Sequence, residues 1–268
     1  MRSLIILAVL GLAAACSQVS SITLSRTPVQ PDALPQISGI LLKDTVLNGA
    51  VVLTADLLVP SGRSLTLRPG TTVYVRSNPS TKIDPEWLSA ETELLVRGSL
   101  HIEGTSDQPV TFLPLDPPEG QEIAWAGILF DRATDSAVRN ARIYQAETGI
   151  LCIDSSPLIR DSVIKGARYG LVIQGSSAPQ VIGNLIHKGE SGVFCWRDAT
   201  PELRDNNISD HQEEGLFVDR QSRPRLSGNQ ISGNDLGLVA YNVDLATQVG
   251  RLSNNREDFR LLGNGGGE

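Results

Sequence analysis

Residues 170–195 read GLVIQGSSAPQVIGNLIHKGESGVFC, and in them two glycines, each followed by three apolar residues, stand 22 positions apart. Between Trp125 and Asn242 this pattern recurs at spacings of 21 to 23 residues, at Gly127, Gly149, Gly170, Gly192, Gly215 and Gly237. Two more columns keep the period: prolines with an apolar residue two places on (Pro157, Pro179, Pro201 and Pro224) and isoleucines (Ile143, Ile164, Ile186, Ile208 and Ile231). A fixed period near 22 residues is typical of a solenoid, in which each repeat forms one coil.

The composition favours an aliphatic core and argues against a nucleic-acid partner. Aromatic residues make up 4% of the 268 residues, and the net charge is −7 with a pI near 5.1. Nucleic-acid binding would need clustered basic residues. Cys152 and Cys195 share one column with Ile173 between them, which puts the sulfurs roughly 9–10 Å apart. A disulfide is too short for that gap, so both are expected to be free, buried thiols.

The N-terminus has the features of a secretory signal. Arg2 precedes an apolar run that is too short to span a bilayer, and small residues lead to Cys16. This ending resembles the lipobox of bacterial lipoproteins, although Ala13 stands where leucine is usual. The resemblance implies a signal peptide at 1–15, a lipid on Cys16, a flexible tether over 16–36 and a place in the bacterial cell envelope. A serine directly after this cysteine, as at Ser17, resembles the sequence of lipoproteins that are sent to the outer membrane.

The next part of the chain reads as short strands. Apolar and polar residues alternate from Ile37 onward and are broken by Pro-Gly and Ser-Gly turns. Insertions interrupt the pattern at 77–91 and 114–122, and loops on one face of a solenoid often carry binding surfaces. Residues 254–262 are expected to leave the repeat and cap the last coil, and 263–268 to be disordered.

Three phrases carry a resemblance to a family: LTLRPGTTV at 65–73, LVRGSLHIEGT with PVTF at 95–112, and WAGILF at 125–130. They resemble the secreted right-handed parallel β-helix proteins of bacteria, which share the pectate-lyase-like fold. The resemblance covers about 37–262 and implies an all-β solenoid of roughly ten coils with three parallel sheets. It does not identify an activity, because such coils serve lyases, hydrolases, adhesins and scaffolds.

Within this fold each column has a predicted role. The first and third residues after each glycine should point inward, together with the isoleucine column and the residue two after each proline. The small glycine is expected to permit a tight turn with positive φ. Asn184, Asn206 and Asn229 are predicted to form a hydrogen-bonded ladder at another turn.

The second residue after each glycine should point outward, and all six are apolar: Leu129, Leu151, Val172, Phe194, Phe217 and Val239. Either a loop covers this face or the column is an exposed apolar stripe for a partner or for self-association. The outward positions that follow add Trp196, Arg197, Asp198, Asp219, Arg220 and Tyr241. Aromatic faces flanked by charged groups suit sugar rings, so these six, with Phe194 and Phe217, are the candidate binding residues. The alternative is a solvated charged face.

An enzyme is the alternative function. Lyases of this fold use acidic calcium ligands and a basic residue, and hydrolases use paired carboxylates. Asp154 and Asp198 lie two coils apart, roughly 10 Å or more, at or beyond the limit for an inverting pair. His101, His187 and His211 occupy different coil positions, so no metal site is expected, and calcium is expected only if the protein is a lyase.

The sequence therefore favours a lipid-anchored, non-catalytic β-helix that presents a surface to carbohydrate or protein. Its alternative is a polysaccharide lyase or glycoside hydrolase acting in a groove on the central coils.

Overall fold

The computed structural model describes residues 30–78, 88–115 and 123–263. The predicted signal peptide, Cys16 and most of the tether lie outside these residues. So do the centres of both predicted insertions and residues 264–268 of the tail.

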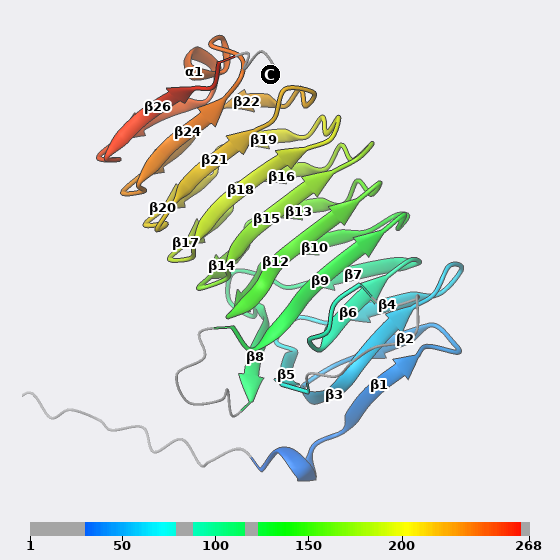
Figure 1. Cartoon of the computed structure of the whole chain (residues 1–268). Coiled ribbons are helices and arrows are strands. Elements are labelled where there is room, and N and C mark those ends of the chain that lie inside the picture. Colours follow the sequence, from blue (N-terminus) through cyan, green and yellow to red (C-terminus); the bar gives the residue numbers. More distant parts are fainter. Residues whose placement is uncertain (1–29, 79–87, 116–122, 264–268) are drawn as a thin grey trace, which may run out of the picture. The chain divides into compact units, whose positions relative to one another are not determined.

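The strands form three rows along a solenoid, and every pairing is parallel (Figure 1). The proline row is an eight-stranded sheet of β2 (Thr45–Leu47), β4 (Ser64–Leu67), β7 (Ser99–Glu103), β10 (Ala137–Arg139), β13 (Leu158–Arg160), β16 (Gln180–Ile182), β19 (Glu202–Arg204) and β22 (Arg225–Ser227). The isoleucine row contains β3 (Ala50–Val59), β5 (Thr72–Arg76), β8 (Val110–Leu115), β11 (Ala141–Tyr144), β14 (Val163–Lys165), β17 (Leu185–His187), β20 (Asn207–Ser209), β23 (Asn229–Ser232) and β25 (Gly250–Ser253). The glycine row contains β1 (Gln36–Ile40), β6 (Glu93–Val96), β9 (Trp125–Asp131), β12 (Ala146–Ile153), β15 (Tyr169–Gln174), β18 (Ser191–Trp196), β21 (Glu214–Val218), β24 (Leu236–Ala240) and β26 (Glu257–Leu261).

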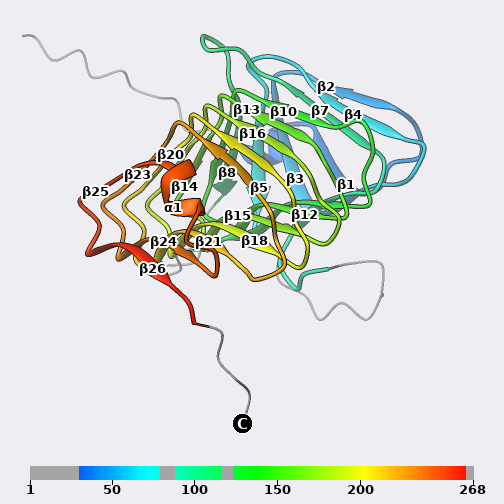
Figure 2. The same ribbon diagram turned by 90° about the horizontal axis from the view of Figure 1, so that it is seen from above.

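The glycine and isoleucine rows join into one 18-stranded sheet because β3 is long enough to pair in both. The nine strands of the isoleucine row give nine coils, close to the roughly ten predicted. Figure 2 shows the coils overlying one another, with the three rows around a common interior. The predicted all-β parallel β-helix is therefore confirmed.

The interior is filled by the columns that the period predicts. Ile143, Ile164, Ile186, Ile208 and Ile231 pair in register from coil to coil and are buried. The first and third residues after each repeat glycine are buried as well. Cys152 and Cys195 are free and fully buried, as predicted.

The repeat glycines act through close approach rather than through backbone conformation. Of the six, Gly127 has a positive φ (115°) and the other five do not, so the predicted left-handed turn is wrong for those five. A Cβ on Gly170 would lie 2.3 Å from Ile186 Cγ2 and 2.6 Å from the Gly192 oxygen. Glycine is needed there because the next coil occupies the space of a side chain.

The predicted asparagine ladder is present. Asn184, Asn206 and Asn229 are buried, and Asn206 Oδ1 accepts from the Asn184 backbone N–H at 3.0 Å while Asn229 Oδ1 accepts from that of Asn206 at 3.1 Å. Their Nδ2 groups donate to the carbonyls of Ile159, Val181 and Leu203. The ladder satisfies backbone groups at the corner before the isoleucine row, where Asn184 and Asn206 lie outside the strands and unpaired groups would be costly to bury.

The C-terminal end keeps the coil. Residues 254–262 were expected to leave the repeat, but β26 within them pairs with β24. What changes is the proline row, where the helix α1 (Leu245–Gln248) follows β22 and contacts it. Among the described residues, helical segments occur only here and at η1 (Pro31–Ala33), before β1. No helix in that part of the chain is long and apolar enough to cross a membrane.

Candidate functional site

The outward apolar column on the glycine row is divided into a covered part and an accessible part. Leu129 and Val239 are buried, so the prediction of a continuous exposed stripe is wrong at these two positions. Leu129 belongs to a small second apolar cluster with Leu58, Leu95 and Ala126, and Leu151 packs against it. Val172, Phe194 and Phe217, on β15, β18 and β21, stay half-exposed.

The accessible part carries a run of aromatic contacts. The rings of Phe194 and Phe217 stack with centroids 5.1 Å apart, and Tyr169 meets Phe194 edge-on at 5.5 Å. Trp196 has 39% of its surface exposed, and its ring centroid lies 5.6 Å from that of Phe217. We call these four rings the aromatic surface.

A shallow groove opens on this surface. Its volume is about 260 Å³, and it is lined by Tyr169, Val172, Gln174, Phe194 and Trp196. This volume lies just below the range of small-molecule sites, and the lining is mainly apolar with a few polar groups at its edge, as in such sites.

The remaining binding candidates lie where the glycine row ends. Asp219 accepts backbone N–H groups of Arg197 (2.7 Å), Ser222 (2.7 Å) and Gln221 (3.1 Å). Burial raises the pKa of the Asp219 carboxyl, but these hydrogen bonds lower it by more, and the net pKa is below its usual value. Asp219 therefore holds this corner of the coil, while the Arg197 side chain is exposed.

The next coil adds a cation over an aromatic ring. The Arg220 guanidinium carbon lies 5.1 Å from the centroid of the Tyr241 ring. Such a pair contributes about 0.5–1 kcal/mol at an exposed site and holds the guanidinium over the Tyr241 ring. The structure thus brings Phe194, Trp196 and Phe217 into contact and leaves Arg220 and Tyr241 as a separate pair.

The two carboxylates considered for catalysis have different surroundings. Asp154 Oδ1 accepts from the Ser176 N–H at 2.8 Å and from its hydroxyl at 3.0 Å, so this carboxylate bonds the corner of the next coil. Asp198 is exposed and has a left-handed backbone with φ of 70°. Among the described residues, no group of three or more His, Cys, Asp and Glu could hold a metal ion.

Three of the five groove residues fall outside the predicted binding residues: Val172, which belongs to the apolar column, and Tyr169 and Gln174, which do not. Tyr169 directly precedes Gly170, a position taken by residues as different as Thr148, Ser191 and Glu214 in other coils, so no column marks it. Gln174 occupies the coil position of Trp196 and pairs with it. Comparing the columns that flank the aromatic residues would have pointed to both.

Comparison with known protein families agrees with the fold. The model of the family described as right handed beta helix region matches residues 126–256. The A-module of a mannuronan C-5 epimerase from Azotobacter vinelandii is similar at 14% identity, over 76% of this chain and 67% of that one, with a TM-score of 0.41. That likeness is too low to carry an argument about function. No curated protein matches the sequence.

Proposed function

We propose that this protein is a non-catalytic carbohydrate-binding protein and that the aromatic surface is its binding face. The single observation that supports the proposal is the contact of four aromatic rings from three consecutive coils on one outward face. Soluble proteins rarely leave such a contiguous apolar patch without a use.

The geometry of the surface suits an extended glycan. Flat aromatic rings stack on the C–H face of a sugar, and polar groups at their rim bond its hydroxyls. Gln174 lies in the groove, and the exposed Arg197 directly follows Trp196, which lines it. Arg220 is exposed on the next coil. Coils repeat about every 4.8 Å, which is close to the length of one sugar unit, so a chain running along the solenoid can meet equivalent positions in turn.

Affinity electrophoresis of the purified full chain in gels that contain neutral or uronate polysaccharides tests the proposal. We expect at least one polysaccharide to retard the protein, and Trp196→Ala to weaken that binding about tenfold because an exposed stacking ring is lost. Tyr144→Ala removes a half-exposed aromatic side chain from the isoleucine row and should leave the retardation unchanged.

Other results would point elsewhere. If no polysaccharide retards the protein but Trp196→Ala shifts its sedimentation, the surface is an interface for self-association or for a protein partner. Release of unsaturated or reducing ends from a polysaccharide, lost in Asp154→Asn or Asp198→Asn, would favour the lyase or hydrolase alternative. Only in the lyase case would calcium be required.

We also propose that a lipid on Cys16 tethers the protein to the bacterial cell envelope, in the outer membrane. Support comes from the sequence around Cys16, which lies outside the described residues. Labelling with a radioactive fatty acid tests this, since Cys16→Ser should abolish the label.

A further inference from the structure

A second hollow lies at the corner where the isoleucine row turns into the glycine row. Six consecutive coils have one residue there with a left-handed backbone, at Gln145, Gly166, Lys188, Asp210, Gly233 and Asn254. These residues stack in one column, so each side chain normally sits above that of the previous coil. Gly166 has no side chain to place between Gln145 and Lys188.

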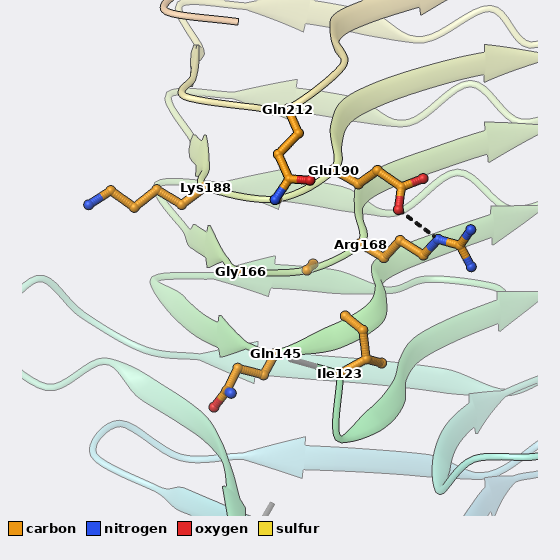
Figure 3. A pocket seen from close by; sticks show the side chains of 9 residues that line it. Ile123, Gln145, Gly166, Arg168, Lys188, Glu190 and Gln212 are labelled. Carbon is orange, nitrogen blue, oxygen red and sulfur yellow. Dashed lines mark hydrogen bonds and ion pairs between the residues drawn. The ribbon is translucent and has the colours of Figure 1, made fainter. Parts of the chain in front are cut away.

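The missing side chain leaves a cavity of about 320 Å³. Ala167 and Gly189 also line the cavity, and their small size leaves it open. Ile123, Arg168, Glu190 and Gln212 complete its lining. Figure 3 shows the Gln212 side chain directed toward Gly166 from two coils above, past the coil of Lys188 and Gly189. The volume is at the lower end of the range for small-molecule sites and is about ten times the share of one water molecule.

Backbone groups contribute little to recognition in this hollow. The N–H groups of Gln145, Gly166 and Lys188 already donate to the carbonyls of Lys165, His187 and Ser209 in the following coils. Side chains are therefore the main groups with which this hollow could hold a ligand.

The charges of those side chains favour an anion. Arg168 is held between two carboxylates, with Glu190 at 3.0 Å and Glu147 at 3.1 Å, so its charge is offset. Lys188 is exposed and makes no ion pair with any residue that the structure describes. With two cations and one carboxylate in the lining, Lys188 supplies the uncompensated positive charge.

We propose that this hollow binds a small polar carboxylate of about the size of a single amino acid. The Lys188 ammonium pairs with the carboxylate, the Gln212 amide bonds a second polar group, and Ile123 packs against the apolar part of the ligand. Figure 3 shows Lys188 extended away from the hollow at its rim, and its flexible stem lets the ammonium reach back over a bound anion. The carboxylate can come from a peptide end or from a sugar acid.

Isothermal titration calorimetry on the purified full chain tests the site with three probes. N-acetylglycine represents the carboxylate end of a peptide, and glycerate represents a sugar acid. N-acetylglycinamide has the shape of N-acetylglycine but no charge, and serves as the neutral control. We expect one carboxylate to bind saturably at one molecule per chain and the amide to bind at least tenfold more weakly. The tighter of the two carboxylates identifies the source.

Two variants locate the binding. Lys188→Gln removes the charge and should weaken binding about tenfold. Gly166→Asn fills the hollow and should abolish it, while the coil survives because a Cβ there meets nothing closer than 3.8 Å and asparagine tolerates positive φ. Lys43→Gln and Gly62→Asn, which repeat the same changes far from the hollow, should bind as the wild type does.

The proposal is overturned if neither carboxylate saturates at millimolar concentration, or if Lys188→Gln binds as tightly as the wild type. Its failure is separable from that of the carbohydrate proposal, because Trp196→Ala leaves the lining of this hollow intact.

Discussion

His211 takes, in its coil, the place that Asn234 takes in the next one, and the two are hydrogen-bonded. Asn234 Oδ1 accepts the His211 backbone N–H at 2.9 Å. The Nε2 of His211 lies 3.1 Å from the Ile186 carbonyl oxygen, and in the next coil the Nδ2 of Asn234 donates to the Ile208 carbonyl in the same way. The Nδ1 of His211 accepts the Gly189 N–H. The buried imidazole therefore continues a second ladder, formed by Asn234 and Asn255, in its neutral form.

This placement predicts an acid-sensitive fold. Burial lowers the pKa of His211 from 6.5 to about 4, and hydrogen bonds to the Ile186 and Gly189 backbone offset only part of this. Between these pH values the unfolded chain binds the proton more readily than the folded one. Stability from this site is therefore complete above pH ~6.5 and falls by about 3 kcal/mol as the pH drops to about 4. Urea unfolding followed by circular dichroism at several pH values measures the loss.

The matched variant for that experiment is His211→Asn, which supplies the residue that the next two coils carry. It should fold and show a flatter dependence of stability on pH. An equally steep dependence in this variant would assign the acid sensitivity to other groups, such as His187, whose pKa is lowered by burial.

Removing one member of the first ladder should destabilise the coil. In Asn206→Ala the buried backbone N–H of Asn184 loses its acceptor. The Asn184 Nδ2 group loses one of its two acceptors and keeps the Ile159 carbonyl. Each unsatisfied buried group costs about 1–3 kcal/mol, so we expect a total loss of about 2–5 kcal/mol in the free energy of unfolding. Asn207→Ala, at the exposed neighbouring position, is the control and should change stability little. Equal stabilities of the two variants would rule out the ladder as a source of stability.

Gly192→Ala tests the role of close approach. Its Cβ would lie 2.3 Å from the Gly215 oxygen and 2.5 Å from Ile208 Cγ2, so two coils must separate. We expect a loss of about 1–3 kcal/mol or more, seen as a lower thermal midpoint. Gly263→Ala meets nothing within 4 Å and serves as the control. An unchanged thermal midpoint in Gly192→Ala would mean that neighbouring coils can move apart at little cost in stability.

The internal thiols should be inert. Burial raises the pKa of Cys152 and of Cys195 well above the usual range, and neither is exposed. Iodoacetamide followed by peptide mapping should leave both unmodified in the folded protein and modify both in urea. Labelling of either under native conditions would reveal local opening of its coil.

Much of the fold could be predicted because the repeat constrains many residues in the same way. One column of isoleucines marks one buried position in every coil, and the alternation of side chains along a strand then assigns the neighbours. The role of Gly170 could not be read in this manner, because a glycine column is equally compatible with positive φ and with close packing. Only the position of Ile186 in the next coil distinguishes them.

The candidate site was less accessible to such reasoning. The outward direction of Leu129 and Phe217 follows from alternation, but their burial depends on what packs over them, and the period contains no such information. Trp196 and Phe217 were recognised because they share neighbouring columns. The hollow at Gly166 could not be predicted, because glycine is ordinary in a column of left-handed turn residues, where Gly233 also stands.

The replacement of a ninth proline-row strand by α1 has a consequence for solubility. An open strand edge is a template on which another chain can add a strand and begin a fibre. After β22 the chain offers α1 instead, which cannot be extended by strand pairing. The other sheet ends in two strands, β25 and β26, where Arg251 on β25 and Glu257, Asp258 and Arg260 on β26 place charges along the last edge. Both sheets thus finish, at their C-terminal ends, in forms that discourage aggregation.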